Sequence, residues 1–349
     1  MERRRAETTQ GLQRILCVGD LCGDLLLPYG QTKRNLAALR EGKTAQMEHM
    51  VQPGDAADQS AAAPQSGDTA AQAGVVFQSG GTVANTAVVL GKLGARPVFI
   101  TDLCKDHIGR FLQAEMEKNG VDLSLAPVSS HAAMLCPAVI EENGERMMFA
   151  WVPPGGAYPT FSKESFAPVL YQEDFLIFTG GMCLNNDPDS MEAVYQFVYQ
   201  MKQRTASRFV FDLNARIESY GLNALRKAYY EKLIALADVV IGSGMEEFGP
   251  ITGAETLEQA AMRLAAADNK LVIARDGAKP VLIYRSGVEA VQRIPTETVQ
   301  VIHTVGAGDA FNGGFLYGMQ HGWSAEVSVM FANQVAGSVI SHAGHLVVE

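Results

Sequence analysis

A carboxylate at the start of a glycine-rich helix is the most informative chemical feature of this sequence. The segment 303–315, HTVGAGDAFNGGF, places Gly306, Ala307 and Gly308 directly before Asp309. Small residues at a helix N-terminus let an anion such as phosphate approach the backbone N–H groups. A carboxylate repels phosphate, so anion binding alone does not explain Asp309, whereas a general base for an attacking hydroxyl does. The alternative interpretation is an Asp N-cap on a closely packed helix.

Alternating strands and helices surround this segment and must position it. Short apolar runs predict strands at 14–18, 97–101, 175–179, 209–213, 239–242, 271–274 and 281–284. Helices are predicted at 83–93 and 108–119. The runs 135–140 and 146–151 predict a hairpin that turns at 142–144. This alternation predicts an α/β fold with a mostly parallel sheet and helices on both faces, and ligands then bind at the carboxyl ends of the strands.

The composition predicts a folded, acidic protein. Of the 349 residues, 47% are hydrophobic and 19% are charged, and the formal net charge is −10. Such a chain can bury a sizeable core, and no basic stretch is long enough to follow a nucleic-acid backbone. The five cysteines form no CxxC pair, which indicates reduced thiols in a cytoplasmic protein. We expect no nucleic-acid partner, no signal peptide and no membrane span.

Residues 80–85, GGTVAN, form a second glycine-rich motif in addition to the segment 303–309. Together the two motifs resemble the Gly-Gly-x-x-x-Asn and Asp-Thr-x-Gly-Ala-Gly-Asp signatures of the ribokinase-like (PfkB) family of carbohydrate kinases. The resemblance extends from about Arg14 to the C-terminus. It implies a ribokinase-like fold with a small β-lid that excludes water, and lids of this kind pair two subunits in several members.

The expected organisation is a solvated tail at 1–10 followed by one kinase domain at 11–349. By resemblance, the lid is discontinuous and is formed from about 24–79 and 131–152. Residues 42–74 are rich in Ala, Gln, Gly, Asp and Ser, which predicts a flexible insertion within the lid segment. A homodimer formed through the lid is one expectation from the family.

The resemblance assigns roles to individual residues. Asp309 is implied as the base, with the anion hole formed by Thr304, Gly306, Ala307 and Gly308. The substrate ligands are implied to be Asp24 in the GDLCGD loop, Gly80, Gly81 and Asn85, with Asn214 and Arg216 in the segment DLNAR. Nucleotide contacts are implied at Arg275, Gly277, Lys279 and Asn333, and Glu247 is implied to organise Mg²⁺ through water.

Four positions depart from the family pattern. Gly244 replaces an Asn near the metal, Arg275 and Pro280 replace a Thr and a Gly of the nucleotide loop, and His303 replaces the first Asp of the signature. In the family that Asp helps to form a monovalent-cation site. Because imidazole is a poor ligand for potassium, we expect little activation by a monovalent cation.

The implied activity is transfer of the γ-phosphoryl group of ATP, with Mg²⁺, to a hydroxyl of a sugar or sugar-derived small molecule. Two other functions stay open at this point. A nucleoside kinase of the same family would use the same chemistry, and a catalytically weak sugar-binding or regulatory homologue would explain the four departures.

Overall fold

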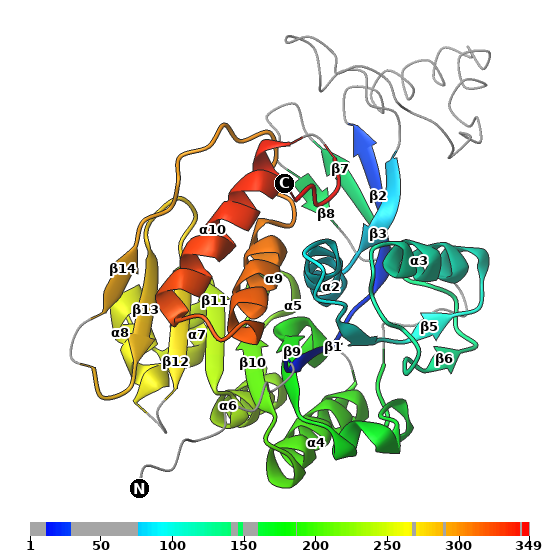
Figure 1. Cartoon of the computed structure of the whole chain (residues 1–349), viewed down its shortest axis with the longest axis horizontal. Helices are drawn as coiled ribbons and strands as arrows, with labels where there is room; N and C mark the ends of the chain where they lie inside the picture. Colours follow the sequence, from blue (N-terminus) through cyan, green and yellow to red (C-terminus); the bar gives the residue numbers. More distant parts are fainter. Residues whose placement is uncertain are drawn as a thin grey trace, which may run out of the picture.

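An eight-stranded sheet forms the centre of the molecule (Figure 1). The structure, a computed structural model, describes residues 12–28, 76–140, 146–148, 160–185, 187–266, 270–288, 291–342 and 344–348. The strand order is β14-β13-β12-β11-β10-β9-β1-β4. The strands are β1 (Arg14–Val18), β4 (Val98–Ile100), β9 (Phe175–Gly180), β10 (Arg208–Asp212), β11 (Val239–Ser243), β12 (Leu271–Arg275), β13 (Val281–Arg285) and β14 (Gln292–Ile294).

The sheet is mostly parallel, as the alternating pattern predicts. β4, β1, β9, β10, β11 and β12 pair in parallel, while β13 and β14 are antiparallel additions at one edge. Each strand predicted for this sheet is present within one residue at either end, whereas β14 was not predicted. The carboxyl ends of the parallel strands therefore meet at one edge, where the predicted site residues follow them.

Helices cover both faces of this sheet, which buries the strands on both sides. One face packs against α2 (Thr82–Lys92), α3 (His107–Lys118), α9 (Ala307–Gln320) and α10 (Ala325–Ser341). The other packs against α4 (Pro188–Arg204), α6 (Ala224–Leu236), α7 (Gly244–Thr252) and α8 (Leu257–Ala265). Along β1, Ile15 and Cys17 join the first core, whereas Leu16 and Val18 join the second. Because successive side chains point to opposite faces and both faces are buried, the strands are continuous apolar runs.

A second, smaller sheet follows directly from the carboxyl end of β1. It contains β2 (Cys22–Pro28), β3 (Val76–Gly80), β7 (Leu135–Ile140) and β8 (Arg146–Met148), in the order β3-β2-β7-β8. β7 and β8 pair antiparallel, which confirms the strands of the predicted hairpin, while its turn lies outside the described residues. Shorter elements are β5 (Leu103–Cys104), β6 (Val128–Ser129), η2 (Lys163–Ser165), η3 (Pro168–Gln172), η4 (Gly181–Asn185) and α5 (Ile217–Tyr220).

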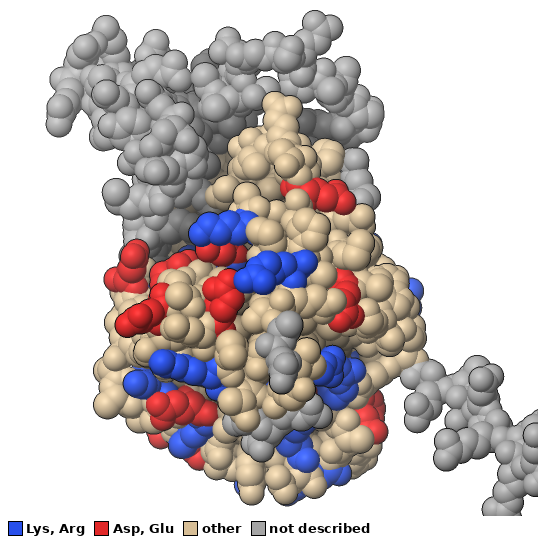
Figure 2. Space-filling model, turned by 90° about the vertical axis from the view of Figure 1, so that its left-hand side faces the viewer, with Lys and Arg blue, Asp and Glu red and all other residues tan. Residues whose placement is uncertain are grey.

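Several predictions concern segments that the structure does not describe. The tail at 1–10, the insertion at 42–74 and most of the lid segment between β2 and β3 lie outside the described residues. Within the described part of the chain, no helix is both long enough and apolar enough to cross a membrane. On the face shown in Figure 2, basic and acidic side chains are interspersed and do not form separate positive and negative patches.

Candidate active site

A polar cavity of about 410 Å³ lies where β10, β11 and β12 end beside the start of α9. It is lined by Asp212, Asn214, Arg216, Ile217, Glu218, Ser219, Ser243, Glu246, Glu247, Arg275, Thr304, Gly306, Ala307, Gly308 and Asp309. The predicted base and all four residues of the predicted anion hole are therefore brought together with Arg216 and Glu247. This edge is the one at which parallel α/β sheets bind ligands.

The start of α9 requires a glycine at Gly306 for two reasons. Gly306 is the N-cap and has a left-handed φ of 72°, and a Cβ there would lie 2.7 Å from Leu346 Cδ2. The backbone N–H of Ala310 donates to the Gly306 carbonyl at 2.7 Å, and this hydrogen bond begins the helix. As a result, the positive end of the helix dipole points into the cavity, which suits an anion.

The Asp309 side chain, in the first turn of α9, is hydrogen-bonded to Asn85 from the other family signature. Asn85 Nδ2 donates to Asp309 Oδ2 at 2.8 Å, and Thr86 Oγ1 donates to the Asp309 carbonyl at 3.2 Å. Both partners belong to α2, which packs along α9 with Gly313 against Val89. The alternative of a simple N-cap is wrong, since the N-cap position is occupied by Gly306.

The electrostatic surroundings of Asp309 favour the protonated form of its carboxyl group. Burial is the largest effect and raises the pKa of Asp309 to about 7, with Asp212 and Asp20 adding to the rise, while the Asn85 hydrogen bond and Arg216 oppose it. A carboxylate with a pKa near neutrality can accept a proton from a hydroxyl at physiological pH more readily than an ordinary Asp. The geometry and the pKa thus agree with the chemistry of a general base.

Arg275 lies beneath the cavity in a buried ion pair. Its Nη2 is 3.3 Å from Asp212 Oδ1, and its Nη1 donates to Gly308 O at 2.8 Å and to Asn312 Oδ1 at 3.2 Å. Asn312 Nδ2 donates to the other Asp212 oxygen at 2.6 Å. The guanidinium also lies 5.1 Å from the centre of the Phe311 ring. Arg275 therefore fixes the first turn of α9 to the end of β10.

Two carboxylates from the first turn of α7 face the same cavity. Glu247 Oε2 accepts from Ser243 N at 2.8 Å, and burial together with Asp212 raises the pKa of Glu247 to about 7. Gly244 begins the helix with a left-handed φ of 60°, and a Cβ there would lie 1.9 Å from Glu246 Oε2. The Glu246 carboxylate thus occupies the space next to the position at which the family pattern has Asn.

The loop after β10 holds Arg216 in a strained conformation. Asn214 and Arg216 have left-handed φ values of 30° and 45°, and Arg216 Nε donates to Asn214 Oδ1 at 2.9 Å. Non-glycine residues in such conformations cost on the order of 1–3 kcal/mol each and persist only where the surroundings enforce them. Here the buried Arg226 donates to the carbonyls of Ala215 and Gly221, which spans the loop.

The predicted acceptor ligands Asp24, Gly80 and Gly81 are not among the residues that line the cavity. Asp24 is 5% exposed, and Gly80 is so close that a Cβ there would lie 2.2 Å from the Asp24 carboxyl carbon. Gly81 has φ 107°, and a Cβ there would lie 2.5 Å from Asp20 O. Asp20 accepts from the backbone N–H groups of Thr82 and Val83 at 2.8 and 3.2 Å, so it caps α2 in place of Gly81.

The remaining predicted nucleotide residues lie outside the cavity lining. Lys279 is paired with Asp276 at 2.7 Å on the surface, and Gly277 is in the adjoining turn with φ 55°. Asn333 Nδ2 donates to the Pro295 carbonyl at 3.2 Å from α10. Of the predicted nucleotide set, Arg275 alone lines the cavity, and its donors are directed to Asp212, Asn312 and Gly308.

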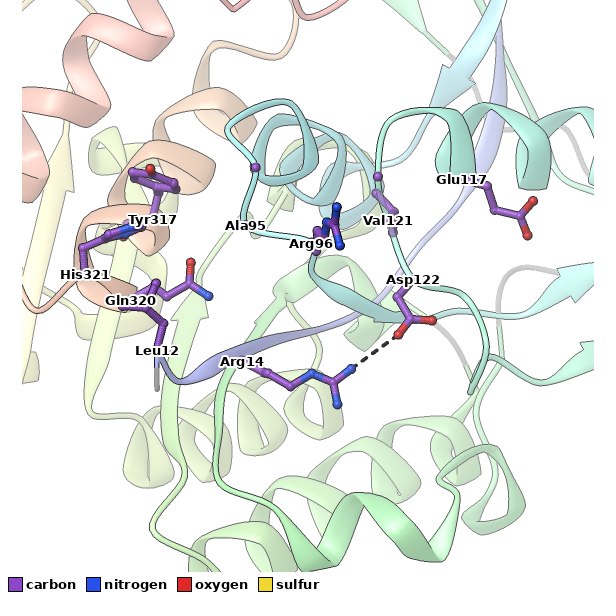
Figure 3. Close-up of a pocket in the computed structure, with 12 residues that line it drawn as sticks. Leu12, Arg14, Ala95, Arg96, Glu117, Val121, Asp122, Tyr317, Gln320 and His321 are labelled. Atoms are coloured by element: carbon purple, nitrogen blue, oxygen red, sulfur yellow. Dashed lines mark hydrogen bonds and ion pairs between the residues drawn. The ribbon is translucent and has the colours of Figure 1, made fainter. Parts of the chain in front are cut away.

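A larger cavity, of about 720 Å³, lies at the opposite end of the sheet (Figure 3). It is lined by residues around the start of β1 and the end of α9, including Arg14, Asp122, Gln320 and His321. Arg14 Nη2 lies 3.4 Å from Asp122 Oδ2 there. Because this cavity is at the amino ends of the strands, far along α9 from Asp309, the smaller polar cavity is the candidate active site.

Comparison with known proteins agrees with the motifs and the geometry. Residues 31–346 match the pfkB family carbohydrate kinase profile. The chain belongs to the pfkB family of carbohydrate kinases. It is 28% identical to the 5-dehydro-2-deoxygluconokinase of Shouchella clausii (strain KSM-K16) over an alignment of 254 residues. This alignment covers 72% of this chain and 76% of that protein. It is 30% identical over 236 residues to the fructokinase of Vibrio alginolyticus, covering 65% and 72%.

Solved structures show the same fold. The fructokinase from Vibrio cholerae O395, in its form with fructose, ADP and calcium ion bound, aligns with a TM-score of 0.73 and 22% identity over 97% of this chain and 96% of that chain. The ribokinase from Thermotoga maritima aligns with a TM-score of 0.68 over 96% and 95%. The predicted ribokinase-like fold is confirmed, and the protein is an ATP-dependent sugar kinase.

Sequence reasoning missed several residues of this pfkB site. Asn312 is three positions after Asp309, so helical periodicity places it beside the same cavity, and Asp212 begins the DLNAR segment. These two signals were present in the motifs. Asp20 accepts from the backbone of a segment about 60 residues away, and Arg226 donates to carbonyls of the loop that precedes its own helix, and no motif in the sequence indicates those contacts.

Proposed function

We propose that Asp309 is the general base of this kinase. The observation that supports it is the 2.8 Å hydrogen bond from Asn85 to a carboxylate whose pKa is raised to about 7 at the start of α9. In the proposed step, the acceptor oxygen forms a bond to the γ-phosphorus of ATP while the bond from that phosphorus to the bridging oxygen of ADP breaks. The hydroxyl proton passes to Asp309, and ADP leaves with the electron pair.

The first turn of α9 supplies the anion site in this proposal. Gly306, Ala307 and Gly308 line the cavity. In the proposal, the N–H groups of this turn stabilise negative charge on the phosphates. Arg275 has a different proposed task, because its donors are directed to protein oxygens. It holds the carbonyl of Gly308 and thereby fixes the orientation of the turn that carries the anion site.

The carboxylates of Glu247 and Glu246 fit a hard divalent cation such as Mg²⁺. Both line the cavity, and carboxylate oxygens are ligands that Mg²⁺ prefers, usually with several retained waters. Mg²⁺ bound there supplies neutralisation of charge on the phosphate oxygens. Burial is the largest cause of the raised pKa of Glu247, and the nearby Asp212 carboxylate adds to it; a cation beside Glu247 would relieve both effects.

For the acceptor we propose a keto sugar acid, of the kind named by the 5-dehydro-2-deoxygluconokinase relatives. Arg216 supports this choice, because it is exposed at the cavity that contains Asp309 and its Nε is already oriented by Asn214. Its remaining guanidinium donors match a carboxylate. Asp24 and Asn85 bind acceptor hydroxyls from the other side, and the sheet β3-β2-β7-β8 acts as the lid that excludes water.

An acceptor panel tests the proposal. ATP consumption is measured with 5-dehydro-2-deoxygluconate, fructose and a riboside, and the sugar acid is expected to have the highest kcat/KM. Arg216→Gln is expected to lower kcat/KM for the acid at least tenfold more than for fructose. An equal loss on both acceptors would show that Arg216 acts on the phosphoryl group instead. Asp309→Asn is expected to lower kcat by about 10² to 10⁴, the usual contribution of a positioned base, and near-normal turnover would exclude that role.

A homodimer formed through the lid is also proposed. The edge strand β3 exposes Val76 and Phe77 to 40% and 36%, and an exposed apolar edge is suited to pairing with a second copy. The molar mass in solution tests this, and a monomer at assay concentrations would contradict it.

A further inference from the structure

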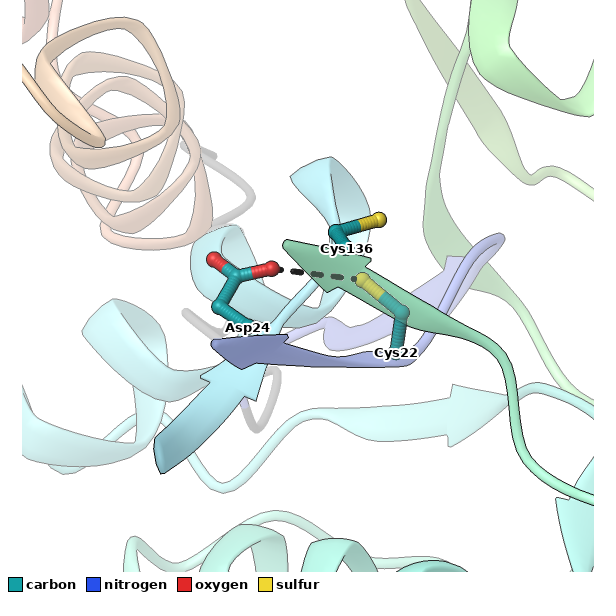
Figure 4. Close-up of side chains that lie close together, drawn as sticks. All are labelled: Cys22, Asp24 and Cys136. Atoms are coloured by element: carbon teal, nitrogen blue, oxygen red, sulfur yellow. Dashed lines mark hydrogen bonds between the residues drawn. The ribbon is translucent and has the colours of Figure 1, made fainter. Parts of the chain in front are cut away.

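Three potential metal ligands lie together on one face of the second sheet (Figure 4). Asp24 on β2 is the register partner of Cys136 on β7, and Cys22 precedes Asp24 by two residues, so all three side chains point to the same face. Their ligand atoms lie within 4.8 Å of one another, and the Cys22 thiol donates to Asp24 Oδ1 at 3.5 Å. Nothing in the proposed kinase chemistry requires either thiol.

The spacing between the Cys22 sulfur and the Asp24 oxygen matches a tetrahedral site for a thiophilic ion. With a Zn–S bond of about 2.3 Å and a Zn–O bond of about 2.0 Å, the sulfur and oxygen of a tetrahedral site lie about 3.5 Å apart. The Cys22 sulfur and the Asp24 oxygen are already at that separation. Two sulfurs and one carboxylate are a ligand set for Zn²⁺ rather than for Mg²⁺, which prefers oxygen ligands in octahedral geometry.

We propose that Cys22, Asp24 and Cys136 form a binding site for Zn²⁺ or a similar thiophilic divalent cation. The three protein ligands leave one position open for water. Entry is from the Cys136 side, because Cys136 is partly exposed whereas Cys22 and Asp24 are 2% and 5% exposed. On binding, the cation displaces the proton of each thiol, and the two protons go to solvent.

A disulfide between the same two cysteines is disfavoured by the strand register. Cys136 is opposite Asp24, so Cys22 is its diagonal neighbour. Two residues along a parallel strand span about 6.6 Å and adjacent strands lie about 4.8 Å apart, so the Cα atoms of diagonal neighbours are about 8 Å apart. This is beyond the separation of about 7 Å that a disulfide can bridge without backbone movement.

The cation and the sugar require the same carboxylate. If Asp24 binds an acceptor hydroxyl, a cation at this site removes an acceptor ligand and inhibits the kinase by competition with the sugar. This second part of the inference rests on the proposed role of Asp24, whereas the binding of the cation does not.

Cobalt titration of the full chain tests the binding, because Co²⁺ bound to thiolate has an intense charge-transfer absorption. One equivalent per chain is expected to produce this band, and Zn²⁺, but not a large excess of Mg²⁺, is expected to abolish it. Cys136→Ser is expected to lower the band by at least half. Cys104→Ser is the matched control, since Cys104 is also a partly buried free thiol but lies outside the cluster, and it should retain the band.

Three results would overturn the site: no band in the unmodified protein, displacement by Mg²⁺, or an equal band in Cys136→Ser. To separate misfolding from lost ligation, the melting temperature is measured with and without Zn²⁺. A rise is expected for the unmodified protein and Cys104→Ser but not for Cys136→Ser. If the cobalt band is missing and returns after treatment with a thiol reductant but not with a chelator, the two cysteines form a disulfide instead.

Kinase assays with Zn²⁺ test the competition. The apparent KM for the sugar is expected to rise in the unmodified protein while that for ATP stays constant, and a chelator should reverse the effect. A cobalt band without any change in the sugar KM would retain the metal site and exclude Asp24 as an acceptor ligand.

Discussion

Replacing Asp309, the proposed base, with its amide is expected to make the protein more stable while it lowers the activity. Asp309→Asn keeps the shape of the side chain, and the amide oxygen can still accept from Asn85. In the folded protein the pKa of Asp309 is raised from 3.8 to about 7, so ionisation of this group opposes folding. The sign follows from linkage: the unmodified protein has this cost in full above about pH 7, and it disappears as the pH falls toward 4.

The magnitude can be bounded from the same values. Each pH unit between the two pKa values is equivalent to about 1.36 kcal/mol, so the interval from 3.8 to about 7 corresponds to at most about 4 kcal/mol. Asp309 is only partly buried by accessible surface, since it lines an open cavity. We therefore expect about half of that value, roughly 2 kcal/mol at pH 8, because solvent screens the charge. For a chain of this length, that is about 3 °C in Tm.

Thermal and urea unfolding at a series of pH values between 5 and 8.5 provides the assay. The stability of Asp309→Asn relative to the unmodified protein should grow with pH and level off above about 7.5. Asp276→Asn, which changes an exposed carboxylate paired with Lys279, is the control and should produce no such gain. If Asp309→Asn is less stable than the unmodified protein at pH 8, the carboxylate is stabilised by its surroundings and the reasoning is refuted.

Three further predictions follow from the site and the sequence. Arg275→Met leaves Asp212 as an unpaired buried carboxylate, so chemical denaturation should show a loss of about 3–5 kcal/mol, and a loss below 1 kcal/mol would contradict a structural role for this pair. Asp24→Ala should raise the KM for the sugar by a factor of about ten or more, since a hydrogen bond to a charged group contributes about 1.5–3 kcal/mol, and an equal rise in the KM for ATP would contradict the assignment. Potassium and a bulky organic cation at equal ionic strength should give similar rates, because His303 replaces the family's Asp and its Nε2 lies 3.1 Å from the His342 carbonyl; strong activation by potassium would mean that other oxygens form the cation site.

The central sheet could be predicted from the sequence because its strands are buried on both faces. β1, β9, β10 and β11 each contain at least three consecutive apolar residues, and such runs have few alternatives in an α/β chain. β2 and β3 were not predicted as strands. β2 contains Gly23 and Asp24, and β3 contains Gln78 and Ser79, so neither matches an apolar run. Their pairing across a segment of nearly 50 residues is a tertiary effect.

The candidate site could be predicted in its motifs but not in its contacts. Asn85 and Asp309 were each identified from separate signatures, and the structure adds that they touch. Arg275 was assigned to the nucleotide because it stands in a loop motif at the end of a strand. Arg275 is the last residue of β12, and its side chain reaches Asp212 at the end of β10, two strands away in the sheet, which the linear order cannot indicate.

The contact between Gly80 and Asp24 has a consequence for how this protein can change by mutation. Any side chain at position 80 would place its Cβ 2.2 Å from the carboxyl carbon of residue 24. A substitution at 80 is therefore tolerated only after residue 24 has become smaller, and once 80 has been filled, a return to Asp at 24 is blocked. The effects of the two substitutions are not additive, because they share one space. A lineage that loses this aspartate and then fills the gap cannot regain it by a single change.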